Sequence, residues 1–201
     1  GCHWWAPNAS TIPHKSTLAF DKIDIRYVPK LTYRDIWLPN ALDPDWSVRN
    51  KRLGQAPAPQ LRSAAPPRGG YIEIWPTFHS FFIVLPPETY FKDHPDWYSL
   101  INGQRTAEPS IHASLCLTNQ EMRRQFITNF IAETQRFPVT YASIGYPDDD
   151  GYPIRCQCPR CLAAEAAGNP SDVMMDFTNE VAQAFEKVNP HVPVAFGAYH
   201  H

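Results

Sequence analysis

Strand signals and helix signals alternate at short spacing in the second half of the chain, and this alternation limits the folds open to it. Apolar residues recur at helical spacing over residues 120–135 and again from Ser171 to Val188. Short apolar segments flank these helices, at residues 114–117, 139–146 and 192–199. Strands joined by connections this short are expected to be parallel, with right-handed helical crossovers.

Two more strands are expected earlier, at residues 31–38 (LTYRDIWL) and 71–75. Between them, residues 54–70 are rich in Pro, Ala and Gly without apolar periodicity, which predicts a long loop. No glycine-rich phosphate motif follows any strand, which disfavours a nucleotide-binding sheet. A complete (β/α)8 barrel needs eight strands and about 250 residues. We therefore expect an α/β fold that holds the first half or so of a TIM-type barrel.

Composition narrows the range of partners. A net charge of -2, from 18 basic and 20 acidic residues, gives no reason to expect nucleic acid. No apolar run approaches about 18 residues, so no transmembrane helix is expected. The counts of 21 Pro and 6 Trp are high and indicate shaped loops and aromatic surfaces of the kind that bind sugars.

Three consecutive carboxylates, residues 148–150, follow the predicted strand 139–146. Catalytic side chains of parallel α/β folds project from the carboxyl ends of strands. Like charges this close oppose one another's ionisation, so one of them is expected to have a raised pKa and could act as an acid. Asp150 and Asp149 are the candidate catalytic residues, and the alternative is a solvated turn.

Five cysteines are unevenly placed, and Cys156, Cys158 and Cys161 form a compact C-x-C-x-x-C motif. This spacing suits metal ligation by thiolates, with Cys116 as a fourth ligand from a neighbouring strand. The alternatives are a disulfide or other structural staple, and catalysis by a thiol. A bound metal predicts sulfur atoms within roughly 4 Å of one another, whereas a disulfide predicts about 2.05 Å.

Contacts to a sugar are predicted at six side chains near strand ends, namely His79, Trp46, Arg49, Asn50, Asn119 and Tyr199. The alternatives are a buried, hydrogen-bonded histidine at His79, a core position for Trp46 and a helix cap at Asn119. Thr118 and Glu121 together predict a capping box at the start of the helix over residues 120–135.

Several longer segments carry a family resemblance: GCHWWAP, TIP, YRDIW, DWSVRNKRLG, FHSFFIVLPPETYFKDHPDWYSLINGQR, SLCLTN, the C-x-C-x-x-C motif and PVAFGAY. With these segments the chain resembles glycoside hydrolase family 163, formerly domain of unknown function 4838. The resemblance implies an endo-β-N-acetylglucosaminidase-like activity on N-glycans, no cofactor for catalysis and an extracytoplasmic location. It also implies that residues 1–30 are the tail of a small α/β domain and that residues 31–201 begin the catalytic barrel, truncated after about five strands.

The same resemblance indicates which of the carboxylates at residues 148–150 is catalytic. The family reads Pro-Asn-Asp-Gly at this strand end, and here the segment from Pro147 to Gly151 has one residue more. Asp150 matches the family's Asp before Gly, and Asp149 is the fallback. Where a sugar carries an N-acetyl group, that group can be the nucleophile beside a protein acid and a stabilising carboxylate. The alternatives are a non-catalytic carbohydrate-binding barrel fragment and a metal-stabilised scaffold.

Overall fold

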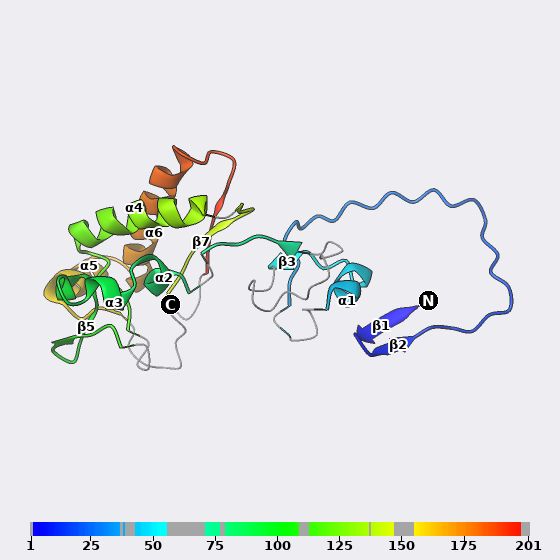
Figure 1. Cartoon of the computed structure of the whole chain (residues 1–201), viewed down its shortest axis with the longest axis horizontal. Helices are drawn as coiled ribbons and strands as arrows, with labels where there is room; N and C mark the ends of the chain where they lie inside the picture. The colour runs from blue at the N-terminus through cyan, green and yellow to red at the C-terminus, as the bar shows by residue number, and fades with distance from the viewer. Residues whose placement is uncertain are drawn as a thin grey trace. The chain divides into compact units, whose positions relative to one another are not determined.

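The computed structural model describes residues 2–36, 38, 43–55, 71–76, 79–108, 113–136, 138–146 and 155–197. The chain divides into two compact units, Gly1–Glu73 and Ile74–His201, which we call the N-terminal unit and the C-terminal unit. The N-terminal unit is drawn in blue to cyan and the C-terminal unit in green to red (Figure 1). The predicted domain boundary after residue 30 stays a prediction.

The N-terminal unit contains small elements. Strands β1 (His3–Ala6) and β2 (Ala9–Thr11) form an antiparallel hairpin, and β3 (Gly54–Gln55) pairs in parallel with β4 (Tyr71–Ile72). Helix α1 (Pro44–Arg49) begins where the Asp43 carboxylate accepts a hydrogen bond from the Trp46 backbone N–H at 2.6 Å. Proline at the first helical position suits this start, because its missing N–H would have had no partner there.

Among the described residues of the predicted strand over residues 31–38, a single isolated β-bridge is formed. Arg34 pairs with Leu53, and the pairing is antiparallel. Next to it, a buried ion pair joins Arg52 Nη2 to Asp35 Oδ1 at 2.5 Å. Burying two charges is tolerable here because each side chain has the other as its partner.

A β-α-β crossover organises the C-terminal unit. Strand β7 (Ala142–Ile144) pairs in parallel with β8 (Val194–Phe196), and helices α5 (Pro159–Ala166) and α6 (Pro170–Glu186) lie between them in the sequence. Ile74 adds a parallel bridge to Tyr141 on the other side of this pair. The predicted parallel pairing of the 139–146 and 192–199 segments is thereby confirmed. The barrel as a whole stays a prediction.

Helix α4 (Gln120–Gln135) has the bounds that the sequence predicts, but its cap differs. Asn119 Oδ1 accepts hydrogen bonds from the backbone N–H groups of Glu121 at 3.0 Å and Met122 at 3.1 Å. The predicted capping box at Thr118 is therefore wrong. The Thr118 hydroxyl instead lies 3.1 Å from the sulfur of Cys161.

The segment before α4 contains helices α2 (Phe81–Val84) and α3 (Pro87–Tyr90), the 3₁₀ helix η3 (Pro95–Trp97) and a hairpin of β5 (Leu100–Ile101) and β6 (Gln104–Arg105). Asn102 and Gly103, both at positive φ, make the two-residue turn that suits the twist of a hairpin. Leu115, expected on a parallel strand, forms an antiparallel bridge with Tyr98. The cause is that the segment containing Tyr98 and Ser99 runs back beside the segment containing Leu115. The Ser99 N–H donates to the Ser114 C=O at 2.9 Å.

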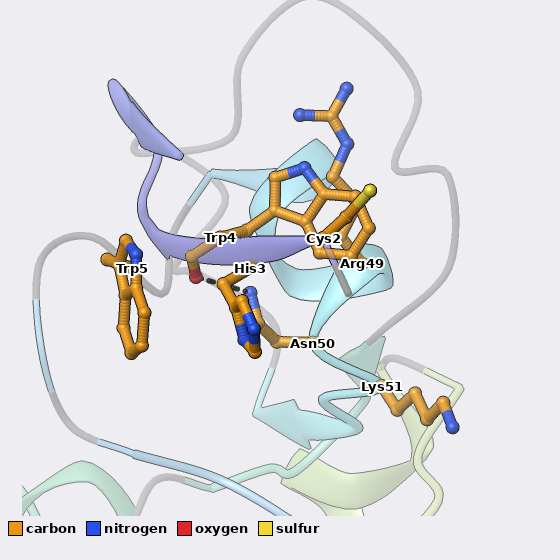
Figure 2. A pocket seen from close by; sticks show the side chains of 7 residues that line it. All are labelled: Cys2, His3, Trp4, Trp5, Arg49, Asn50 and Lys51. Atoms are coloured by element: carbon orange, nitrogen blue, oxygen red, sulfur yellow. Dashed lines mark hydrogen bonds between the residues drawn. The ribbon is translucent and has the colours of Figure 1, made fainter. Parts of the chain in front are cut away.

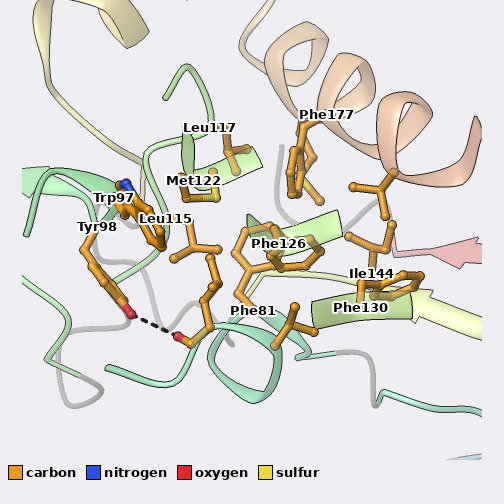
Figure 3. Packing of buried hydrophobic residues seen from close by; sticks show 14 of the residues in the cluster. Phe81, Trp97, Tyr98, Leu115, Leu117, Met122, Phe126, Phe130, Ile144 and Phe177 are labelled. Carbon is orange, nitrogen blue, oxygen red and sulfur yellow. Dashed lines mark hydrogen bonds between the residues drawn. The ribbon is translucent and has the colours of Figure 1, made fainter. Parts of the chain in front are cut away.

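The core of the C-terminal unit is rich in aromatic side chains (Figure 3). Helix α4 contributes Phe126 and Phe130, and α6 contributes Phe177, which meets Phe126 edge to face with ring centroids 5.0 Å apart. Phe81 of α2 packs edge to face on both of these rings, and Ile144 of β7 is fully buried beside them. Edge-to-face rings gain beyond their buried area, so this cluster fixes the two long helices against β7.

Candidate metal centre

Four cysteines converge in the C-terminal unit. Cys116, Cys156, Cys158 and Cys161 are each at most 5% exposed, and their sulfur atoms all lie within 4.8 Å of one another. Cys116 follows the Leu115 bridge, whereas Cys156 and Cys158 lie just before α5, and Cys161 lies in its first turn. The motif and Cys116 converge as predicted, within 4.8 Å rather than the roughly 4 Å expected.

The spacing of the sulfur atoms distinguishes the alternatives. Cys116 Sγ lies 3.7 Å from Cys158 Sγ and 3.8 Å from Cys161 Sγ. A disulfide needs about 2.05 Å, and all five cysteines of the chain, Cys2 included, are free thiols. In a tetrahedral zinc site with Zn–S bonds of about 2.3 Å, the sulfur atoms are about 3.8 Å apart. The cluster could therefore bind a metal ion.

Polar groups surround the sulfurs. The Leu100 backbone N–H donates to Cys156 Sγ at 3.3 Å, and the Arg105 Nη1 lies 3.6 Å from the same atom. The N-terminus of α5, where Cys158 is the N-cap residue, favours negative charge on nearby thiols. N–H···S bonds and a guanidinium are partners for thiolates rather than for apolar thiols.

Ionisation of the four thiols is coupled. Hydrogen bonds from Cys156 and Cys161 lower the pKa of the Cys116 thiol. The hydrogen bond with Cys116 raises the pKa of Cys156 to about 11 and also raises the pKa of Cys161. Although burial opposes it, hydrogen bonds with Cys161 lower the pKa of Cys158. Without a cation, the cluster thus favours ionisation of Cys116 and Cys158 and opposes ionisation of Cys156 and Cys161. A divalent ion among the sulfurs would reverse this and favour all four thiolates.

A second feature, in the N-terminal unit, brings together two of the residues predicted to contact a sugar. Arg49 and Asn50 line a hollow of about 320 Å³ beside β1 (Figure 2). Its other lining residues are Cys2, His3, Trp4, Trp5 and Lys51. The Arg49 guanidinium lies over the Trp4 ring, 5.8 Å from its centroid, and Asn50 Nδ2 donates to the Trp4 carbonyl at 3.3 Å. The hollow therefore combines aromatic faces with cationic groups.

Trp46, the third of these predicted residues, is buried and does not line the hollow. Its indole N–H donates to the Trp4 carbonyl at 3.0 Å, which ties it to β1 and agrees with the alternative of a core position. The indole rings of Trp4 and Trp5 were not among the predicted contacts. The adjacent tryptophans of the HWWA strand are the signal that could have indicated them.

Comparison with known families gives one result. The model of a domain of unknown function, DUF4838, matches residues 4–201. The chain belongs to the DUF4838 family. No curated protein and no solved structure matches it.

In this DUF4838 chain, His79 lies beside the end of β7. Its Nδ1 is 2.7 Å from the Tyr146 carbonyl oxygen, and Ser80 exchanges hydrogen bonds with Gly145 at 3.1 and 3.2 Å. The side chain is exposed, so the alternative of a buried histidine is wrong. His79 is thereby fixed next to Tyr146, which precedes the carboxylates at 148–150 by two residues in the sequence.

The other predicted residues of the DUF4838 chain divide into two groups. Asn119 is buried, caps α4, and donates from Nδ2 to Asp96 Oδ2 at 2.7 Å, so its amide is engaged within the fold. Asp149, Asp150 and Tyr199 lie outside the described residues. Among the helices that the structure describes, none has the length and apolar character needed to cross a membrane.

Proposed function

We propose that Cys116, Cys156, Cys158 and Cys161 bind one structural zinc ion. The observation that carries the proposal is the convergence of four sulfurs within 4.8 Å of one another. Two of their separations, from Cys116 to Cys158 and to Cys161, are 3.7 and 3.8 Å, close to the edge of a tetrahedral zinc tetrathiolate. Thiolate ligands select soft or borderline ions such as zinc, and four protein ligands leave no open position for a substrate. Burial of the whole set is also typical of a structural rather than a catalytic site.

The metal would join parts of the chain that are distant in sequence. The cysteines form a small buried cluster apart from the main aromatic core, with Leu100 packed against it. A cluster of four thiols supplies little apolar burial of its own, so zinc binding would supply the free energy that holds this corner of the unit together.

Metal analysis tests this directly. We expect protein purified with zinc in the medium to contain one zinc per chain, by elemental analysis. Substitution with Co²⁺ should give the thiolate charge-transfer bands and the visible bands of tetrahedral cobalt. A protein that takes up neither ion, although its four thiols react as free cysteines after unfolding, contradicts the proposal.

We further propose that the chain is part of a glycoside hydrolase that acts on N-acetylglucosamine-containing glycans, with Asp150 and Asp149 as stabiliser and acid. Three observations support it: the resemblance of the sequence to a glycosidase family, the parallel pair of β7 with β8, and His79 fixed where β7 ends. Glycoside hydrolysis needs a proton donor for the leaving oxygen and a negative group near the anomeric carbon, and strand-end carboxylates supply both.

In the proposed reaction, the N-acetyl oxygen of the sugar attacks its own anomeric carbon as the glycosidic bond breaks. Asp149 donates a proton to the leaving oxygen, and the Asp150 carboxylate stabilises the positive charge that develops on the N-acetyl group. The proposed substrate lies outside the cytoplasm, in agreement with the family resemblance. The runner-up is a carbohydrate-binding module with the same surfaces and without turnover.

The hollow beside β1 gives this proposal a second test. We expect Arg49→Ala to weaken binding of an N-acetylglucosamine-terminated N-glycan about tenfold, since it removes a charged donor from the lining, and such a donor contributes about 1.5 kcal/mol or more. Titration calorimetry measures the change. Arg26→Ala, which removes an exposed arginine outside the hollow, is the matched control. Equal affinities for the two variants would exclude the hollow as a sugar site.

A further inference from the structure

The β5–β6 hairpin is bonded directly to the loop that carries two of the cysteines. Leu100 N–H donates to Cys156 Sγ at 3.3 Å, and Leu100 C=O accepts from Gln157 N–H at 2.7 Å. At the turn, Asn102 N–H donates to Gln157 Oε1 at 2.8 Å. Backbone groups of the hairpin thus bond to Cys156 through its sulfur and to Gln157 through both its backbone and its side chain, and these contacts fix the loop at two consecutive residues.

Arg105, at the end of the hairpin, places a positive charge against the cluster. Its Nη1 lies 3.6 Å from Cys156 Sγ and also donates to Tyr98 C=O at 2.7 Å and, more weakly, to Asp96 C=O at 3.3 Å. These carbonyls hold the guanidinium in one orientation. Among the described residues, none of the ion pairs includes Arg105, and the Cys156 sulfur would be the anionic partner of its charge once a metal ion is bound.

The net charge of a zinc site with four thiolates explains why a positive side chain such as Arg105 would matter here. Four thiolates around one divalent ion carry a net charge of -2, and a buried excess charge is costly unless a counter-charge is near. Groups that hydrogen-bond to metal ligands orient them and commonly change metal affinity by about 10 to 100-fold. Arg105 supplies both a positive charge and a donor to the same sulfur atom.

We propose that Arg105 is a positioning residue of the metal centre, which raises its zinc affinity through Cys156, and that zinc in turn orders the β5–β6 hairpin. The two parts are linked, because a segment that strengthens zinc binding when it is ordered is in turn stabilised in that order by bound zinc. This inference rests on the zinc site proposed above and adds to it a segment more than 50 residues away in sequence, since 156 − 105 is 51.

Arg155 provides a matched control for Arg105. It precedes Cys156 in the sequence, but its guanidinium pairs with Glu165 at 3.4 Å. Arg105→Leu keeps the approximate volume of the side chain and removes its charge and donors. Arg105→Lys keeps the charge but cannot reach two carbonyls and a sulfur from one rigid group, so it should restore part of the affinity.

The test is competition for Zn²⁺ with a chromophoric chelator, on the whole chain. We expect the zinc dissociation constant to rise about 10 to 100-fold for Arg105→Leu, less for Arg105→Lys, and to change less than about threefold for Arg155→Leu. The visible bands of the Co²⁺ form should shift in Arg105→Leu, because the donor to one sulfur is lost. Unchanged affinity and bands in Arg105→Leu overturn the role of Arg105 and leave the zinc site standing.

Hydrogen–deuterium exchange of the unsubstituted chain tests the other half and does not depend on any variant folding. We expect zinc to slow exchange at the amides of Leu100 and Asn102, both of which donate within this contact. Equal exchange of these amides with and without zinc overturns the proposed ordering of the hairpin. Failure of the unsubstituted chain to bind Zn²⁺ at all overturns the zinc site and the inference together.

Discussion

Cys161→Ser is expected to abolish stoichiometric zinc binding and to lower the stability of the C-terminal unit strongly. Serine keeps the size of the side chain but is a far poorer ligand, because zinc binds thiolate and the hydroxyl does not ionise near neutral pH. At free zinc about 1,000-fold above the dissociation constant, binding contributes about 4 kcal/mol to stability. A domain has only about 5 to 15 kcal/mol in total, so this loss is large.

The measurement is the free energy of unfolding in urea, followed by hydrogen–deuterium exchange of α4 and α6, which report on the C-terminal unit alone. Cys2→Ser is the control, since Cys2 is exposed and lies outside the cluster. Chelation of zinc from the unsubstituted chain should reproduce the effect of Cys161→Ser. If chelation and Cys161→Ser leave α4 and α6 as protected as in the control, the cluster is not a structural metal site.

Asp150→Asn is expected to lower kcat on an N-acetylglucosamine-containing glycan by at least about 100-fold. Removal of a charge that acts mainly in the transition state reduces turnover more than it reduces substrate binding, so KM should change little. The assay requires a polypeptide that contains this chain together with all eight strands of the proposed barrel. Rates of release of the reducing sugar, measured at several substrate concentrations, separate kcat from KM.

Asp148→Asn is the matched control for this prediction, because it removes a neighbouring charge that has no assigned role. Asp149→Asn tests the proposed acid, and a leaving group of low pKa should restore its rate in part, since such a group needs less protonation. Near-normal turnover in both Asp149→Asn and Asp150→Asn would identify residues 148–150 as a solvated turn and place the catalytic pair elsewhere.

Two patterns of the sequence, apolar residues at helical spacing and the alternation of strands with helices, determined much of the C-terminal unit. Helix α4 has its predicted bounds because Met122, Phe126 and Phe130 repeat at helical spacing and are all buried. The parallel pairing of β7 with β8 followed from a helical crossover between two apolar segments. Such patterns are reliable because burying one face of a helix or both faces of a strand gains free energy whatever its exact neighbours are.

The pairing and the caps of the short elements were harder to predict, because they depend on which side chains and segments lie nearby in the fold. Leu115 pairs antiparallel with Tyr98 because the β5–β6 hairpin returns the chain to that position. Thr118 does not cap α4, because the adjacent Asn119 caps it, and the Thr118 hydroxyl lies against Cys161, which is 43 residues away. A helix cap contributes only about 1 kcal/mol, so a neighbouring side chain or a tertiary contact can outweigh such a local preference.

The sequence by itself determined which residues could form a metal site, and the tertiary structure decided that they meet. The C-x-C-x-x-C spacing allowed a disulfide, a metal or a free thiol, because cysteine chemistry depends on sulfur–sulfur distance. Only the fold brings Cys116 to 3.7 Å from Cys158, too far for a disulfide and suited to a tetrahedral ion. It also brings Arg105 to Cys156, a contact without any local sequence signal, since its cause is the packing of a hairpin on a loop 51 residues later.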